Sequence, residues 1–128
     1  MAYNLIWKKK GIIINFSGIV NSFEIVKVNS IIYGDPRFDS MEYQLCDFSN
    51  VQKGIGSEKD ARMIGALDKS SSRWNRHIKV ICVTKDTFAI EMIQAYASML
   101  KDTGWEVIIV DDFDTAWNLV KSFKMECQ

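Results

Sequence analysis

The chain has 128 residues, of which 48% are hydrophobic, 25% are charged, 7 are Gly and 1 is Pro. This composition excludes a disordered chain and a collagen-like repeat, and the length predicts one domain, residues 1–128, with its own hydrophobic core. Sixteen basic side chains balance 16 acidic ones, so the formal net charge is zero. We therefore expect no nucleic acid as a partner, because a neutral chain has no electrostatic attraction for it.

Apolar runs and cysteine spacing indicate the compartment. The longest apolar runs, such as Val107–Val110, are too short to cross a bilayer, and the lysines at 8–10 follow the N-terminal apolar segment, the reverse of the charge order in a secretory signal. Cys46, Cys82 and Cys127 are odd in number and lack Cys-x-x-Cys spacing. We expect a cytoplasmic protein with reduced thiols and no stable membrane insertion.

Strand-like runs alternate with amphipathic helical segments along the whole chain. Runs rich in β-branched and aromatic residues indicate strands, and apolar residues three or four positions apart indicate helices that bury one face. The predicted elements are a strand Tyr3–Trp7, a strand Ile12–Phe16, a helix from Asn21 to Gly34, a strand Glu42–Asp47, a helix from Ser57, a strand Ile78–Val83, a helix from 84–87 to Gly104, a strand Trp105–Val110 and a helix after Asp111-Asp112.

Short-range signals predict where these elements begin and end. The polar segment 8–11 ends in Gly11, which predicts a hairpin turn with a left-handed glycine. Ser17-Gly18 is expected to end the second strand, and the small residues of 49–56 are expected to form a loop. Ser57 and Asp60 resemble a capping box at the start of a helix.

The resulting order is β-β-α-β-α-β-α-β-α. A hairpin followed by three strands that alternate with helices predicts an α/β fold, because each crossover places a helix on the sheet between parallel strands. We expect a mixed, mostly parallel five-stranded sheet with four helices. The run Ile78–Val83 is apolar apart from Lys79, as is typical of a central parallel strand.

Five segments, distributed over nearly the whole chain, indicate a family. They are Phe16-Ser17-Gly18, Tyr33-Gly34-Asp35-Pro36-Arg37-Phe38-Asp39-Ser40, Asp47-Phe48-Ser49-Asn50-Val51, Ala66-Leu67-Asp68 and Gly104-Trp105-Glu106-Val107. With the order of elements, they resemble the STAS family of bacterial anti-sigma factor antagonists, and more closely a set of small, uncharacterised SpoIIAA-like bacterial proteins. The resemblance implies a single STAS-like domain. The broader group is also compared with the CRAL-TRIO lipid-carrier fold.

The resemblance draws attention to Ser57. In the STAS family, an Asp-Ser pair at the start of the corresponding helix contains the serine that is phosphorylated. Counted from Asp47, that pair falls on Ile55-Gly56, and Ser57 lies one residue later. We therefore expect Ser57 to act as a helix N-cap, and phosphorylation by a kinase is the alternative.

Asp68 lies on a helix face that is expected to point inward. Ile64 and Leu67 belong to the predicted inner face, and Asp68 follows Ile64 by four residues. An unpaired buried carboxylate is costly, so Asp68 must reach a rim or find a partner such as Lys69, Arg73 or a loop amide. The functional interpretation places this carboxylate in the lining of a pocket.

Two further residues are candidates for a functional site. Trp74 is expected to be the least buried aromatic residue, either at an interface or as a lid over the sheet edge. His77 is the sole histidine, and the cysteines are not paired in sequence, so we expect no metal site and no cofactor. General acid and base groups do not converge in the sequence, so an enzyme is not expected.

These observations predict a non-enzymatic signalling or protein-interaction module of STAS-like fold, with a protein partner. The alternative is a small CRAL-TRIO-like carrier that binds an apolar or lipid-like ligand between helices and sheet. A methionine-lined cavity of several hundred Å3 would favour the carrier, and an exposed patch around the second helix would favour the interaction module. A weak homodimer is also expected, because the chain is neutral, Trp74 is exposed and Tyr3–Trp7 is an edge strand.

Overall fold

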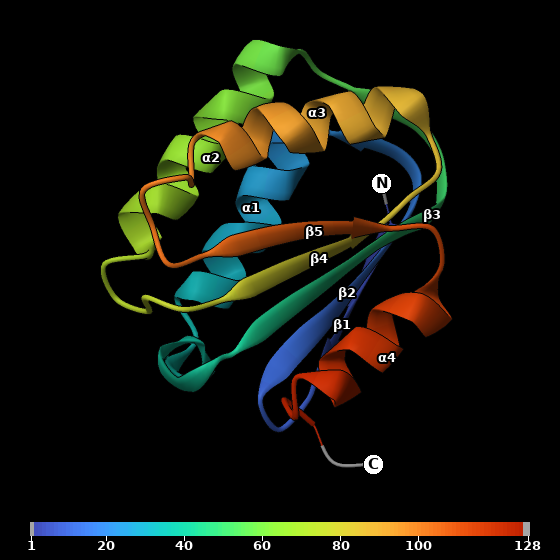
Figure 1. The fold of residues 1–128 in the computed structure, drawn as a ribbon. Helices are drawn as coiled ribbons and strands as arrows, with labels where there is room; N and C mark the ends of the chain where they lie inside the picture. Colours follow the sequence, from blue (N-terminus) through green and yellow to red (C-terminus); the bar gives the residue numbers. More distant parts are fainter. Residues whose placement is uncertain (1, 127–128) are drawn as a thin grey trace.

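The computed structural model describes residues 2–126, and Cys127 lies outside the described residues. The elements are β1 (Ala2–Trp7), β2 (Gly11–Asn21), α1 (Ser22–Tyr33), the 3-10 helix η1 (Pro36–Ser40), β3 (Tyr43–Ile55), α2 (Glu58–Ser71), β4 (Lys79–Val83), α3 (Thr87–Ser98), β5 (Glu106–Val110) and α4 (Phe113–Ser122) (Figure 1). Apart from the added η1, this is the predicted order β-β-α-β-α-β-α-β-α. None of the described helices is long and apolar enough to cross a membrane.

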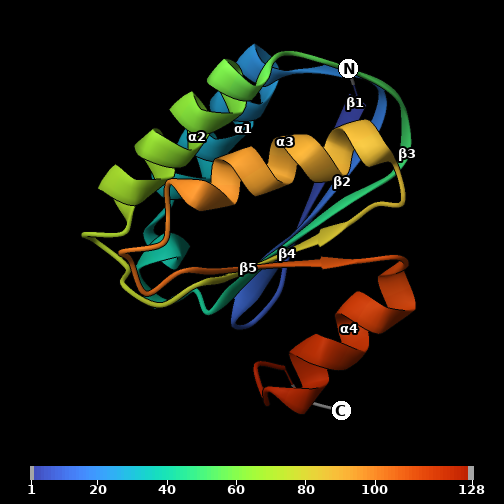
Figure 2. The ribbon, with the colours of Figure 1, turned by 45° about the horizontal axis from the view of Figure 1, so that its top comes forward.

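The strands form one mixed sheet in the order β1-β2-β3-β4-β5. β1 is antiparallel to β2, whereas β2, β3, β4 and β5 are parallel to one another. Helices α1, α2 and α3 cover one face of the sheet, and α4 covers the other (Figure 1 and Figure 2). The predicted α/β architecture, a mixed and mostly parallel sheet with helices packed on it, is therefore confirmed.

Strands β2 and β3 are both longer than predicted. Ser17-Gly18 does not end β2, which continues to Asn21, and residues 49–55 extend β3 instead of forming a loop. The two extensions pair with each other as far as Asn21 with Ile55, so each one satisfies the backbone hydrogen bonds of the other. Gly18 has a φ of 73° at a register shift, so it marks an irregularity within the pair rather than the end of a strand.

Gly11 follows the hairpin turn for a different reason from the predicted one. It is not left-handed, because Gly18 and Gly56 are the glycines with positive φ among the described residues. A Cβ on Gly11 would lie 2.5 Å from two ring carbons of Tyr43. The packing of the Tyr43 ring, and not the backbone conformation, therefore excludes a side chain at this position.

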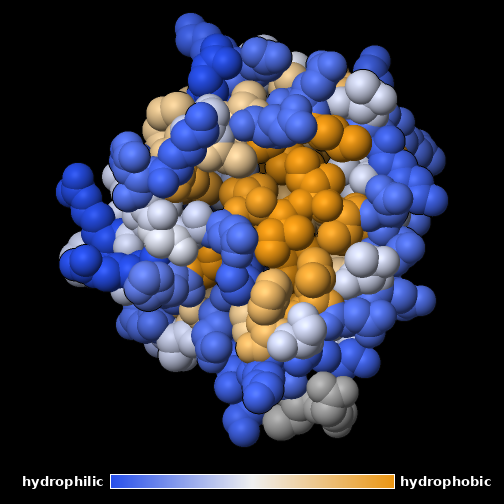
Figure 3. All heavy atoms as spheres, in the orientation of Figure 1, coloured by the Kyte–Doolittle hydropathy of each residue, from blue (hydrophilic) through white to orange (hydrophobic). Residues whose placement is uncertain are grey.

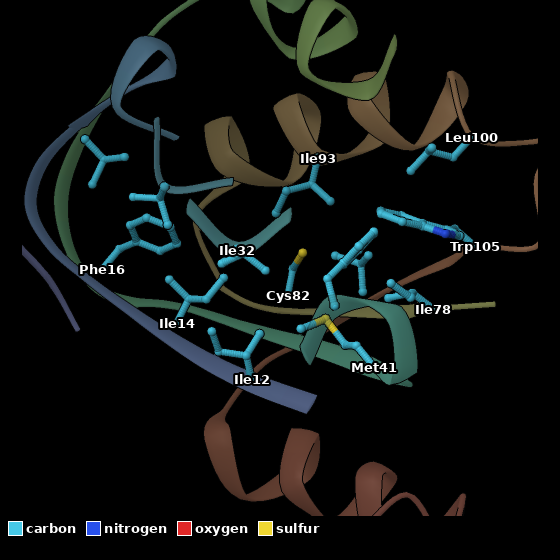
Figure 4. Packing of buried hydrophobic residues seen from close by; sticks show 14 residues of the cluster. Ile12, Ile14, Phe16, Ile32, Met41, Ile78, Cys82, Ile93, Leu100 and Trp105 are labelled. Atoms are coloured by element: carbon cyan, nitrogen blue, oxygen red, sulfur yellow. The ribbon is translucent and has the colours of Figure 1, made fainter. Parts of the chain in front are cut away.

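Successive side chains of β2 enter two different apolar layers. Ile12, Ile14 and Phe16 belong to the layer beneath α1, α2 and α3, and Ile13 belongs to the layer beneath α4. Figure 4 shows the first layer, where Ile93 of α3 points toward the sheet. Because both faces of the sheet are covered, the central strands are apolar at consecutive positions, which made them recognisable in the sequence.

The two edges of the sheet are β1 and β5. On β1, Tyr3 is 41% exposed and Ile6 is 40% exposed. On β5, each of the residues 107–110 is partly exposed. Figure 3 shows apolar side chains gathered on the face where α3 lies beside β5. Unpaired edges with apolar side chains are places at which a second chain can pair.

Candidate functional site

Helices α2 and α3 approach closely at Gly65. A Cβ on Gly65 would lie 2.5 Å from the carbonyl oxygen of Tyr96 and 2.8 Å from Cβ of Met99. The absence of a side chain therefore allows the two helix backbones to pack against each other. This contact places Asp68, the next inward-facing residue of α2, beside the Tyr96 side chain of α3.

Asp68 is 2% exposed, and its partner is a tyrosine rather than Lys69 or Arg73, both of which are exposed. The Tyr96 hydroxyl donates a 2.5 Å hydrogen bond to Asp68 Oδ2. The Tyr33 hydroxyl lies close to the same carboxylate, yet neither it nor Asp68 Oδ1 makes a full hydrogen bond to a described residue. Two buried polar atoms on the inner side of α1 and α2 are thus left unsatisfied.

Burial changes the ionisation of this cluster. It raises the pKa of Asp68 to about 6, although the hydroxyls of Tyr96 and Tyr33 oppose the rise by favouring the carboxylate. Burial and the nearby charge of Asp68 raise the pKa of both tyrosines well above their ordinary value. At neutral pH the tyrosines are therefore hydrogen-bond donors, and Asp68 is mainly an acceptor.

A cavity of about 170 Å3 lies beside this cluster, between the sheet and the three helices α1, α2 and α3. Its walls are mostly apolar, and they include Phe16, Val20, Ile25, Phe48, Val51, Ala61, Ile64, Val80, Phe88, Ala89, Met92 and Ile93. Asp68, Tyr96 and Gln44 are among its polar lining residues. Asp68 is therefore among the residues that line this cavity.

Two cysteine side chains also line the cavity. Cys46 of β3 and Cys82 of β4 are direct neighbours in the parallel register, and both are free thiols. A hydrogen bond with Cys82, together with burial, raises the pKa of the Cys46 thiol well above its ordinary value. A thiol of this kind is a weak nucleophile at neutral pH.

Ser57 is the N-cap of α2 and lies at the cavity lining. Its Oγ accepts a 3.2 Å hydrogen bond from the Asp60 backbone N–H, and Asp60 Oδ2 accepts one of 3.2 Å from the Ser57 backbone N–H. The hydroxyl of Ser22 donates a further 3.3 Å hydrogen bond to Asp60 Oδ2. The side chain of Ser57 thus takes part in a complete capping box, in an exposed position.

Trp74 lies in the turn after α2 and is 79% exposed. The turn is fixed by its neighbour Asn75, whose Nδ2 donates hydrogen bonds of 2.8 Å and 2.7 Å to the carbonyls of Phe38 and Met41. The buried Trp105 donates a 2.7 Å hydrogen bond from Nε1 to the Asn75 carbonyl. The backbone of this turn is therefore anchored, while the indole of Trp74 is exposed to solvent.

Two apolar side chains of α2 are exposed on the same helix. Met63 is 48% exposed and Leu67, one turn later, is 47% exposed. The prediction that Leu67 faces inward is wrong, because the buried face of α2 contains Ala61, Ile64, Gly65 and Asp68. We call Met63, Leu67 and Trp74 the α2 patch.

Basic side chains are exposed on α2 and in the turn that follows it. Lys59, Arg62, Lys69 and Arg73 are all exposed, and Arg62 forms a 3.5 Å ion pair with Glu58. A polar hollow of about 490 Å3 lies at the C-terminal end of α2 and includes Lys69, Arg73, Arg76, His77 and Asp102 in its lining. His77 is exposed there, and within residues 2–126 no three His, Cys, Asp or Glu side chains are grouped to hold a metal ion.

No family model matches the sequence, and no curated protein is similar to it. A solved structure is similar, however: the anti-sigma factor antagonist SpoIIAA in its unphosphorylated form. The similarity covers 94% of this chain and 98% of that chain, with a TM-score of 0.62 and 10% sequence identity. At this identity the likeness concerns the fold alone. The protein therefore has the STAS-like fold that its sequence resembles.

Proposed function

We propose that this protein is a non-enzymatic signalling module of one domain that binds a protein partner through the α2 patch. The exposure of Met63, Leu67 and Trp74 is the observation on which the proposal rests. Met63 and Leu67 lie one turn apart on α2, and Trp74 lies in the turn after it. Exposed large apolar side chains are typical of interaction sites, and tryptophan is enriched among the residues that contribute most to binding. The turn that carries Trp74 is anchored through Asn75, so the backbone of this turn needs little ordering on binding.

The charges beside the patch indicate the chemistry of the partner. Lys59 and Lys69 are exposed on α2 and Arg73 is exposed in the turn that follows it, and Arg62 forms a 3.5 Å ion pair with Glu58. A partner surface that combines apolar side chains with acidic ones would complement this arrangement. The anti-sigma factor antagonist with which this protein shares its fold supports a signalling role. A cytoplasmic setting, in which the thiols stay reduced, belongs to the same proposal.

The cavity does not support the lipid-carrier alternative. Its volume of about 170 Å3 is smaller than the several hundred Å3 expected of a carrier. Met92 lines the cavity, whereas Met63 is exposed on the outer side of α2. The raised pKa of Cys46 also disfavours nucleophilic catalysis in the cavity.

The proposal is tested by comparing substitutions inside and outside the patch. A partner is first captured on the wild-type protein, purified, and its affinity is measured by calorimetry. Leu67→Ser and Trp74→Ser should each weaken binding about tenfold or more, as expected of central interface residues. Ile31→Ser is the matched control, because Ile31 is 46% exposed but lies on α1. Unchanged affinity in both patch variants would show that the α2 patch is not the binding surface.

A further inference from the structure

We propose that the cavity between the sheet and α1, α2 and α3 is a binding site for a small, uncharged and largely apolar molecule. The ligand has the bulk of about one aromatic ring and one hydrogen-bond donor, which binds the carboxylate of Asp68. This site is separate from the α2 patch, because Asp68 is buried on the inner face of α2 while Met63 and Leu67 are exposed.

The size and the lining of the cavity indicate how large and how apolar the ligand is. An engineered apolar cavity of about 150 Å3 binds benzene in another protein, and the cavity here has about 170 Å3. The lining is dominated by apolar side chains from three helices and three strands. Ile55 and Phe88, which are 52% and 40% exposed, belong to the same lining and reach the surface. A molecule of one ring can therefore enter from solvent.

The position of the cavity also favours a ligand site. Ile55 is the last residue of β3, and Ser57, Ser22 and Phe88 lie at or near the N-termini of α2, α1 and α3. In open α/β sheets, ligands bind outside the carboxyl ends of the strands, and this cavity opens at that end, although the strand order β1-β2-β3-β4-β5 has no reversal of the kind that marks most such sites. The cavity extends from this end of the sheet inward to Asp68.

The hydrogen-bond donor of the ligand is inferred from a buried oxygen atom of Asp68 that has no partner among the described residues. Asp68 is 2% exposed and lines the cavity, and its Oδ1 has no hydrogen-bond partner among the described residues. The Tyr33 hydroxyl lies close to this carboxylate but makes no full hydrogen bond to it, so Tyr33 does not satisfy Oδ1. Leaving a buried carboxylate oxygen unpaired is costly, so a donor that reaches it is favoured. A ligand hydroxyl or N–H supplies that donor, and Tyr96 remains bound to Oδ2.

The charges around the cavity exclude an anion as ligand. The N-terminal ends of α2 and α3 are capped by the carboxylates of this chain, since Asp60 accepts from Ser57 N–H and Asp86 accepts from Ala89 N–H. Asp68 adds a third acidic side chain at the inner end. A carboxylate or phosphate ligand would meet like charges and no free basic side chain among the lining residues.

Three ligands with the same ring test the inference: benzyl alcohol, toluene and benzoate. Each is titrated into isotope-labelled protein, and backbone amide shifts are followed by NMR. We expect benzyl alcohol to shift the amides of cavity residues such as Ile64 and Ile93, toluene to bind about tenfold more weakly, and benzoate to cause no shifts there. Absence of shifts with benzyl alcohol up to its solubility limit would overturn the inference, and equal binding of benzoate would do the same.

Variants locate the bound molecule and its donor. Ala89→Leu places a larger side chain in the cavity lining and should abolish binding, whereas the matched Ala66→Leu, at an exposed position outside this cavity, should leave it unchanged. The double variant Asp68→Leu/Tyr96→Phe removes both hydrogen-bonding partners at similar volume, so benzyl alcohol should bind no better than toluene. Retained binding in Ala89→Leu would place the ligand elsewhere. These titrations contain no protein partner, so their failure is distinct from failure of the proposed function.

Discussion

The hydroxyl of Tyr96 on α3 donates a hydrogen bond of 2.5 Å to the buried carboxylate of Asp68 on α2. This polar contact joins two helices that also approach each other closely at Gly65. A buried carboxylate with a single firm hydrogen bond costs stability that an apolar residue would not. The proposed ligand site uses this carboxylate, and its titration makes the stability of the fold sensitive to pH.

The free energy of unfolding should fall as the pH rises from about 4 to about 6. The pKa of Asp68 is about 6 in the folded protein, compared with 3.8 for an ordinary aspartate. The folded state therefore binds the proton more tightly, so stability is fully present below the lower pKa and is lost as the pH rises through the upper one. The difference between these two pKa values corresponds to a loss of about 3 kcal/mol in the free energy of unfolding. Urea unfolding of the wild type between pH 4 and pH 8 measures it.

Asp68→Asn is the decisive comparison for this pH dependence. An asparagine can still accept the hydrogen bond from Tyr96, yet it does not titrate, so its unfolding free energy should lack the fall between pH 4 and pH 6. The other shifted groups around Asp68 are Tyr33, Tyr96 and Cys46, whose pKa values are raised well above this range. Asp102→Asn, at an exposed position, is the control and should behave as the wild type. The same fall in Asp68→Asn would refute the assignment.

Gly65→Ala should destabilise the protein by about 1–3 kcal/mol, because an overpacked contact forces neighbouring groups to move. The added Cβ would lie 2.5 Å from the Tyr96 carbonyl oxygen, which belongs to a helix backbone and cannot rotate away. Thermal unfolding measures the change. Ser70→Ala, at an exposed position of the same helix, is the control and should have little effect. A neutral Gly65→Ala would mean that α2 and α3 are not held as closely as described.

The order of elements was predictable because its signals are local. The capping residues Asn21 and Ser57 lie next to the helices that they start, and the apolar period of each helix is contained in its own segment. The extension of β3 to Ile55 was not predictable, because it depends on pairing with a strand more than thirty residues earlier. The inward position of Asp68 was recognised from helical spacing. Its hydrogen-bond donor Tyr96 and its neighbour Tyr33 were not recognised, because they come from two other helices.

Leu67 illustrates a different kind of error. Leu67 follows Ile64 by three residues, and this spacing is compatible with either a buried or an exposed position at the edge of the helix face. The hydrophobicity of leucine favoured the buried position. The small Gly65 marks the buried face more reliably, because close contact with α3 requires it. The small residue Gly65, next to the apolar Ile64, was the signal in the sequence for the buried face of α2. Leu67 lies instead on the exposed side of α2 with Met63, and both belong to the α2 patch.

A weak homodimer should form at tens of micromolar. The formal net charge is zero, so copies of the chain do not repel each other over long distances. The edge strand β1 offers unpaired backbone groups together with Tyr3 and Ile6, which are 41% and 40% exposed. Sedimentation equilibrium of the wild type and of Ile6→Lys measures the association, and the added charge should weaken it. A clean monomer in the wild type would contradict this prediction.

Ser57 should behave as a helix cap and not as a phosphorylation switch. Its Oγ accepts a hydrogen bond from the Asp60 backbone N–H, so Ser57→Ala should cost about 0.5–2 kcal/mol of unfolding free energy. Ser57→Asp should retain or slightly raise stability, because aspartate also caps and its charge suits a helix N-terminus. Both variants should bind the partner with unchanged affinity. A switch would behave differently, since Ser57→Asp would weaken partner binding while Ser57→Ala would not. Chemical unfolding and calorimetry separate the two patterns, and phosphate on Ser57 in cells, coupled to loss of the partner, would establish the switch.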